Sequence, residues 1–151
     1  MCEMRSEEGQ AMAADLTDNL DRIASLVKDV QARAPAVANT YQQRLLDRLN
    51  KLLTEHALTV EPADVVREVG LFVDRSDISE ETVRLSSHLE LFSAEIKSPD
   101  AQGRKLDFLT QEMFREANTI GSKANDSHIS ALVIDIKTSI ERMREMIQNV
   151  E

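Results

Sequence analysis

The sequence feature that most constrains the fold is the stretch from residue 103 to residue 126, where apolar side chains recur every three or four positions. An α-helix has about 3.6 residues per turn, so side chains at this spacing lie on one face. The apolar positions are Leu106, Leu109, Met113, Ala117, Ile120 and Ala124. The stretch therefore predicts an amphipathic helix that buries this stripe against other helices.

The opposite face of the predicted helix is polar and carries acids, cations, amides and hydroxyl groups. Its residues are Lys105, Phe108, Gln111, Glu112, Arg115, Glu116, Asn118, Thr119, Ser122 and Lys123. Phe108 is unusual there, because an aromatic ring on a solvated face leaves apolar surface in water. The ring either stacks on a nucleobase or packs against another helix or subunit. We expect the second arrangement.

The remaining sequence has the same helical period and no run with the alternation of a β-strand. We expect further helices over residues 4–34, 37–56, from 62, 79–97 and from 127. Pro35 is expected to end the first helix, because it lacks an N–H group and clashes with the preceding turn. Ser79 is expected to cap the helix that follows it. The expected fold is a single all-α domain over residues 1–151, with five or six helices in an elongated helical bundle and long coiled-coil-like first and last helices.

The composition supports this class and limits the function. Hydrophobic residues make up 42% of the chain and charged residues 30%, a mixture typical of helical proteins. The net charge of −9 argues against a domain coated in nucleic acid, although it allows a local basic patch. The single cysteine, Cys2, indicates a reducing compartment, and no apolar run approaches the roughly 20 residues that span a bilayer. We expect a soluble cytoplasmic protein with no membrane partner.

Two acids on the polar face, Glu112 and Glu116, lie one helical turn apart. They form either a solvated face, where such acids repel by roughly 0.2–0.5 kcal/mol, or a site for a divalent cation, which prefers oxygen ligands. The spacing alone favours the solvated face, with Lys105 and Lys123 placed to relieve the repulsion. His88 joins the acids as a ligand or base only if its helix faces theirs.

Cations and amides on the same face predict contacts with phosphate groups. The residues concerned are Arg104, Lys105, Gln111, Arg115, Asn118 and Lys123. The sequence has no glycine-rich nucleotide loop, no cluster of Cys and His with metal-ligand spacing and no HExxH motif. The residues alone thus support a helical domain with one candidate functional face.

Several segments, spread over essentially the whole chain, resemble the YicC/YloC family of bacterial proteins. In chain order they include Met4-Arg5-x-x-Glu8-Gly9, Asp77-Ile78-x-Glu80-Glu81-x-x-Arg84-Leu85-x-x-His88-Leu89, Gly103-Arg104-Lys105-Leu106-Asp107-Phe108-Leu109, Arg115-Glu116-Ala117-Asn118-Thr119-Ile120 and Met143-Arg144-Glu145-x-Ile147-Gln148-Asn149-Val150-Glu151. The resemblance is to the C-terminal half of these proteins, whose separate N-terminal domain has no counterpart here.

The resemblance implies an endoribonuclease that acts on RNA with a divalent metal, Mn²⁺ or Mg²⁺, and that self-associates into a homo-oligomer, a hexamer in the full-length protein. With this implication, the expected catalytic and metal-binding residues are Glu112, Glu116 and His88. The expected RNA-binding residues are the cations and amides named above. Two classes remain open: a metal-dependent endoribonuclease with its catalytic helix here, or a non-catalytic helical domain for oligomerisation and RNA guiding.

Overall fold

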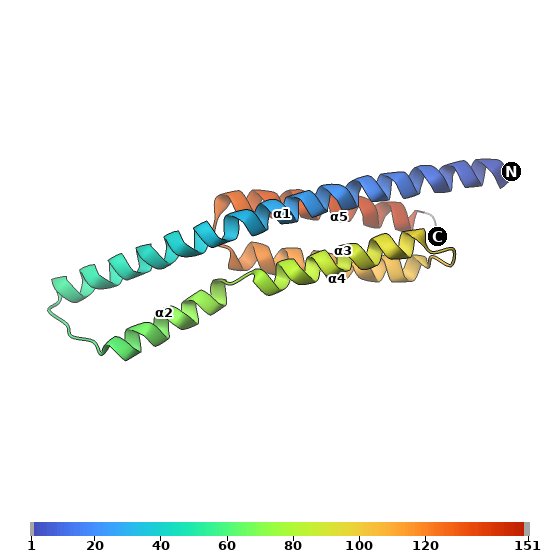
Figure 1. Ribbon diagram of the computed structural model, residues 1–151. Helices are drawn as coiled ribbons and strands as arrows, with labels where there is room; N and C mark the ends of the chain where they lie inside the picture. The colour runs from blue at the N-terminus through green and yellow to red at the C-terminus, as the bar shows by residue number, and fades with distance from the viewer. Residues whose placement is uncertain (1, 150–151) are drawn as a thin grey trace.

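The computed structural model describes residues 2–149, which form α-helices joined by short links (Figure 1). The helices are α1 Cys2–Glu55, α2 Pro62–Ser76, α3 Ser79–Lys97, α4 Gly103–Lys123 and α5 Ser127–Gln148. These residues contain no β-strand, so the all-α class is confirmed. None of the helices described has the length and apolar content needed to cross a membrane.

Four of the helices form an elongated antiparallel bundle. The N-terminal part of α1 contacts α3 and α5, and α4 contacts the same two helices from the other side (Figure 1). Each helix therefore has two antiparallel neighbours and one diagonal partner across the core, as in an up-down bundle. The bundle has four helices rather than the five or six expected.

The expected break at Pro35 is wrong, because α1 continues through this residue to Glu55. Proline in a helix removes one N–H donor and costs about 3 kcal/mol. Val30 on one side of Pro35 is fully buried, and Ala34 and Val37 also pack against the core. This packing on both sides outweighs the local cost, so the two predicted N-terminal helices are one.

Residues 36–76, here called the arm, extend the molecule beyond the bundle (Figure 1). The arm consists of the C-terminal part of α1, a short link and α2, which has no fully buried side chain. The rings of Tyr41 and Phe72 stack across it, with centroids 4.5 Å apart. Its exposed apolar side chains are Leu52, Leu58, Val60, Val66, Leu71 and Val73. The arm is thus held by much less apolar burial than the bundle.

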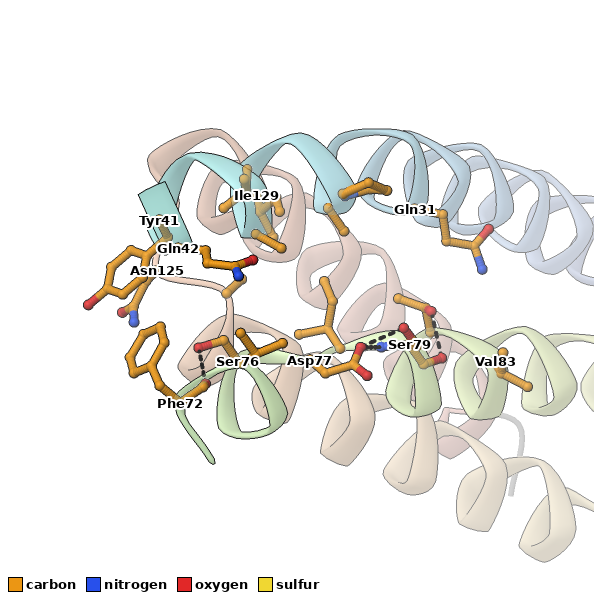
Figure 2. A pocket seen from close by; sticks show the side chains of 18 residues that line it. Gln31, Tyr41, Gln42, Phe72, Ser76, Asp77, Ser79, Val83, Asn125 and Ile129 are labelled. Atoms are coloured by element: carbon orange, nitrogen blue, oxygen red, sulfur yellow. Dashed lines mark hydrogen bonds between the residues drawn. The ribbon is translucent and has the colours of Figure 1, made fainter. Parts of the chain in front are cut away.

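An apolar cavity of about 450 Å³ lies where the arm joins the bundle (Figure 2). Polar groups in its wall bond to their own segment: Ser76 Oγ donates to the carbonyl of Phe72 at 3.0 Å. The amide and hydroxyl of Ser79 donate to Asp77. The side chain of Asp77, rather than that of the expected Ser79, therefore accepts the hydrogen bond from the first amide of α3. These polar groups are used locally, so the cavity offers mainly carbon surface.

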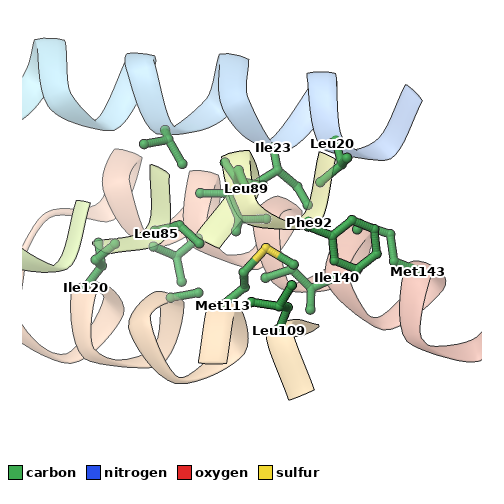
Figure 3. Close-up of a cluster of buried hydrophobic side chains, with 14 of the residues drawn as sticks. Leu20, Ile23, Leu85, Leu89, Phe92, Leu109, Met113, Ile120, Ile140 and Met143 are labelled. Atoms are coloured by element: carbon green, nitrogen blue, oxygen red, sulfur yellow. The ribbon is translucent and has the colours of Figure 1, made fainter. Parts of the chain in front are cut away.

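The core is built from the apolar stripes of the four bundle helices (Figure 3). All six apolar positions predicted on α4 are buried, and Met113 and Ile120 are completely enclosed. Phe92 of α3 is also fully buried and is the largest enclosed side chain. The predicted amphipathic helix is confirmed, and its buried stripe fixes which residues of α4 face α3, α5 and solvent.

The start of α5 is joined to α1 by a single side chain. The carboxylate of Asp126 accepts a hydrogen bond from the amide of Ile129 at 3.0 Å, as an N-cap does. It also forms an ion pair with Arg33 at 2.6 Å. The hydrogen bond from Arg33, with that from Ile129, lowers the pKa of Asp126 to about 2. Asp126 therefore caps α5 and also holds it against α1.

Candidate functional site

The polar face of α4 is divided by the bundle into three parts. One flank faces α3, the opposite flank faces α5, and the middle faces solvent. We call the middle the solvent stripe; its residues are Arg104, Phe108, Gln111, Arg115, Asn118 and Ser122, all exposed. The polar face of α4 is continuous in the sequence, but in the structure its flanks contact other helices and its middle is exposed to solvent.

Three buried carboxylates line the contact between α3 and α4. Glu81 and Glu95 come from α3 and Glu116 from α4, and each is less than one-tenth exposed. Each has a cation on the opposite helix. The pairs are Glu81 with Lys123 at 2.5 Å, Glu95 with Lys105 at 2.6 Å and Glu116 with Arg84 at 2.9 Å. We call these six residues the ionic seam.

Each buried acid of the seam is paired with a cation, and this pairing is needed because an unpaired buried charge is strongly unfavourable. Hydrogen bonds from Lys105 and from the amide of Gln102 lower the pKa of Glu95. Burial acts to raise the pKa of Glu81, but the bonds and charges around it, led by Lys123, leave it lowered. The hydrogen bond to Glu116 raises the pKa of Arg84. Glu81 and Glu95 are thus held ionised by the lysines of α4.

Two expectations about this face are corrected. Glu116 was expected on a solvated face, but it is 6% exposed. Lys105 and Lys123 were expected to offset repulsion between the acids of α4, but they pair with acids of α3 instead. The physical reason is the antiparallel register, which places a cation of one helix opposite an acid of the other.

The register set by the flanking pairs puts His88 of α3 level with Glu112 of α4, although no hydrogen bond or ion pair joins these two side chains among the described residues. The Arg84–Glu116 pair lies to one side of them and the Glu95–Lys105 pair to the other. The Nδ1 atom of His88 is buried and has no hydrogen-bond partner among the described residues. The Glu112 side chain is 23% exposed, 3.5 Å from Arg115, at the border with the solvent stripe. The helix of His88 therefore faces the helix of Glu112 and Glu116, which the expected role of His88 requires.

The fit of a metal ion to Glu112, Glu116 and His88 can be tested on these contacts. Glu116 is buried and already accepts a hydrogen bond from Arg84 Nε, a cation that occupies the side facing α3. Within residues 2–149 there is no group of three or more His, Cys, Asp or Glu side chains placed to hold a metal ion. The three residues of one chain therefore do not fit a complete metal site.

The predicted phosphate-contacting residues separate into two groups. Arg104, Gln111, Arg115 and Asn118 lie together on the solvent stripe, whereas Lys105 and Lys123 belong to the ionic seam. Phe108 is also on the stripe and is 57% exposed, so it is not part of the buried core of this chain. The stripe carries two arginines and no carboxylate.

Sequence reasoning missed the α3 side of the seam, namely Glu81, Arg84 and Glu95. A signal for them exists: together with His88 they recur at helical spacing beside the apolar stripe of α3. Their partners on α4 depend on the register between the two helices, which a single sequence does not give.

Fold and site together define an all-α antiparallel bundle in which the exposed stripe of α4 carries two arginines. A family model described as "Endoribonuclease YicC-like, C-terminal" matches residues 30–151. A protein of Clostridioides difficile (strain 630) named "Probable endoribonuclease YicC" is 39% identical over 149 residues, covering 99% of this chain and 50% of the relative. A protein of the same name from Haemophilus influenzae (strain ATCC 51907 / DSM 11121 / KW20 / Rd) is 38% identical over 148 residues, covering 98% and 50%.

The chain therefore belongs to the YicC-like endoribonuclease family, through its C-terminal domain. It spans about half the length of the curated relatives it matches. The resemblance seen in the sequence is confirmed.

Proposed function

We propose that this chain is the helical C-terminal part of an endoribonuclease and that α4 is the helix that contacts RNA. The observation that carries the proposal is the solvent stripe, which presents Arg104 and Arg115 and has no carboxylate of its own, although Glu112 lies at its border 3.5 Å from Arg115, in a chain of net charge −9. Arginine forks suit phosphate oxygens. The names of the relatives support an RNA substrate.

Cleavage of a phosphodiester needs a proton acceptor for the nucleophile and relief of charge on the phosphate. Glu112 and His88 are the groups we propose for proton transfer, because the register of the flanking ion pairs puts them level with each other and Glu112 borders the stripe. Arg115, 3.5 Å from Glu112, is placed to relieve phosphate charge. We propose that Glu116 acts indirectly, by fixing α4 against α3 through Arg84.

Dependence on Mn²⁺ or Mg²⁺ belongs to the same proposal and rests on the family resemblance. Residues 2–149 do not complete a metal site, so ligands from another part of the protein, a second copy or the RNA itself are required. The chemistry that such an ion supplies is charge neutralisation at the phosphate.

A second function, a non-catalytic domain for oligomerisation and RNA guiding, is favoured by two observations. The ionic seam uses Glu116 for packing, and the arm exposes apolar side chains that suit a contact with a second copy. In this case the chemistry is performed by another part of the protein.

A cleavage assay separates the two functions. A labelled structured RNA is incubated with the chain, or with the full-length Clostridioides difficile relative, in Mn²⁺, Mg²⁺ or EDTA. The catalytic proposal expects metal-dependent cleavage by the chain and its loss in Glu112→Gln. The matched variant Glu141→Gln, on α5, is expected to keep wild-type activity.

An inactive chain beside an active full-length relative supports the guiding function, in which another part of the protein performs the chemistry. Cleavage that is unchanged in Glu112→Gln and in His88→Gln, with the fold intact, contradicts the proposed residues. Cleavage that is equal in EDTA contradicts the metal dependence.

A further inference from the structure

The aromatic side chains of this protein differ in how they are used. Phe92 is fully buried, Tyr41 and Phe72 stack on each other, and Phe114 lies under a lysine ammonium 4.9 Å from its ring centroid. Phe108 alone among the aromatics of residues 2–149 belongs to the large apolar side chains that are exposed, at 57%. Its ring is thus available to a partner from outside this chain.

Phe108 lies between the two arginines of the solvent stripe. An α-helix rises about 1.5 Å per residue, which places Arg104 about 6 Å before the ring and Arg115 about 10 Å after it. The amide of Gln111 lies one turn from the ring on the same stripe. A strand that crosses the ring along α4 therefore meets a guanidinium group on either side of it.

The charge of the stripe favours a phosphate strand as the occupant. The exposed faces of the other helices carry carboxylates, for example Asp18 on α1, Glu68 on α2, Glu90 on α3 and Asp135 on α5. The stripe has two arginines, two amides and a hydroxyl around the ring. Arginine binds phosphate oxygens, amides bind base edges, and an exposed aromatic ring binds a base face.

We propose that Phe108 stacks on an unpaired base of single-stranded RNA, with Arg104 and Arg115 on the flanking phosphates. The inference rests on the proposed RNA function and adds the substrate class. In a duplex the bases are already stacked on each other, so only an unpaired or splayed base offers its face to the ring. The α4 face thus selects single-stranded regions, such as loops and ends, over paired ones.

The test measures binding of a short fluorescein-labelled RNA, single-stranded or annealed to its complement, without added divalent metal. Phe108→Leu keeps an apolar side chain but removes the ring, and is expected to weaken single-strand binding about tenfold. Phe108→Trp is expected to retain binding. Ile134→Ala, on an equally exposed apolar position of α5, is the matched control and is expected to bind as the wild type does.

A 2-aminopurine placed within the single strand reports stacking directly, because its fluorescence is quenched against an aromatic ring. At saturating protein the wild type and Phe108→Trp are expected to quench it, and Phe108→Leu to leave it bright. Far-UV circular dichroism is expected to be the same for all variants, since Phe108 is exposed and lies outside the core.

Three results overturn the inference. If the wild type binds RNA and Phe108→Leu binds and quenches equally, the stacking is wrong and the RNA function stands. If the wild type binds no RNA at low salt, the stacking inference and the proposed RNA function are both wrong. If Phe108→Leu lowers the mass in sedimentation and leaves quenching unchanged, the ring lies between copies of the chain.

Discussion

At the residue scale, Glu116 shows how neighbours decide the role of a side chain. The sequence places it one turn from Glu112, as one member of a matched pair of acids. The structure buries it against Arg84, while Glu112 stays at the edge of the solvent stripe. Two identical side chains on one helix thus have different environments, because one faces α3 and the other borders the solvent.

Replacing Arg84 tests the packing role of the ionic seam. Arg84→Met leaves the buried Glu116 carboxylate without its cation and is expected to lower the free energy of unfolding by about 1–3 kcal/mol. Urea denaturation followed by circular dichroism measures this loss. Arg142→Met, at an exposed position of α5, is the matched control and is expected to change stability by no more than about 0.5 kcal/mol. Equal stability of both variants would show that the seam does not hold the helices together.

At the element scale, the ends and interruptions of helices are decided by more than local sequence. Asp126 caps α5 and also pairs with Arg33 of α1, so one carboxylate fixes a helix start and a helix contact. Pro35 lies inside α1 although proline usually ends helices. In both cases the neighbouring helices supply the deciding interactions.

The pair between Asp126 and Arg33 makes stability depend on pH. The pKa of Asp126 in the folded protein is about 2, below the value of about 3.9 for an unfolded aspartate. The pair therefore stabilises the fold above about pH 4, and this contribution is lost as pH falls from about 4 to about 2. Asp126→Asn keeps a capping side chain but removes the charge. In thermal melts across this range it is expected to be less stable near neutral pH and to lose less on acidification; an unchanged acid dependence would exclude the pair as its cause.

Restoring a backbone donor in α1 tests whether packing holds this helix straight through its proline. Pro35→Ala returns an N–H group for the carbonyl of Gln31 and a better helix former, and is expected to raise the free energy of unfolding by about 1–3 kcal/mol. Chemical denaturation measures the gain. A loss of stability would mean that the proline ring is needed in the wall of the cavity, where it lies.

At the scale of the whole molecule, the protein is a well-packed bundle that carries a lightly packed arm. The bundle encloses the core of α1, α3, α4 and α5, whereas α2 has no fully buried side chain. The solvent stripe and the ionic seam both lie on the bundle, on helices whose positions are fixed by this core. The candidate site is therefore on the rigid part of the molecule.

Hydrogen–deuterium exchange measures this difference directly. Amides of α2 are expected to exchange much faster than amides of α4, because local opening of the arm exposes little buried apolar surface. Comparison at low and high protein concentration tests self-association through the arm. If its exposed leucines and valines meet a second copy, protection of α2 increases with concentration. Equal protection of α2 and α4 in the dilute protein would contradict the division into bundle and arm.

Much of the fold follows from the helical period of the apolar residues. The period located α2, α3, α4 and α5 and the buried apolar positions of α4, because burial of an apolar stripe is the main driving force of such helices. It did not predict a continuous α1. The cost of Pro35 is visible in the local sequence, whereas the compensating contacts of Val30 and Val37 are made with other helices. The role of Asp77, which accepts the amide of Ser79 at the start of α3, was missed because Ser79 itself suits a cap.

The sequence by itself determined the all-α class, the apolar stripe of α4, the family and the residues available for chemistry, because these depend on residue type and on spacing along one helix. The tertiary structure decided which acids are buried, that Arg84 holds Glu116, that His88 lies level with Glu112 and that Phe108 faces solvent. These properties depend on the register and order of packed helices. Register is a relation between distant segments, set by the packing of the whole core, and no single helix contains it.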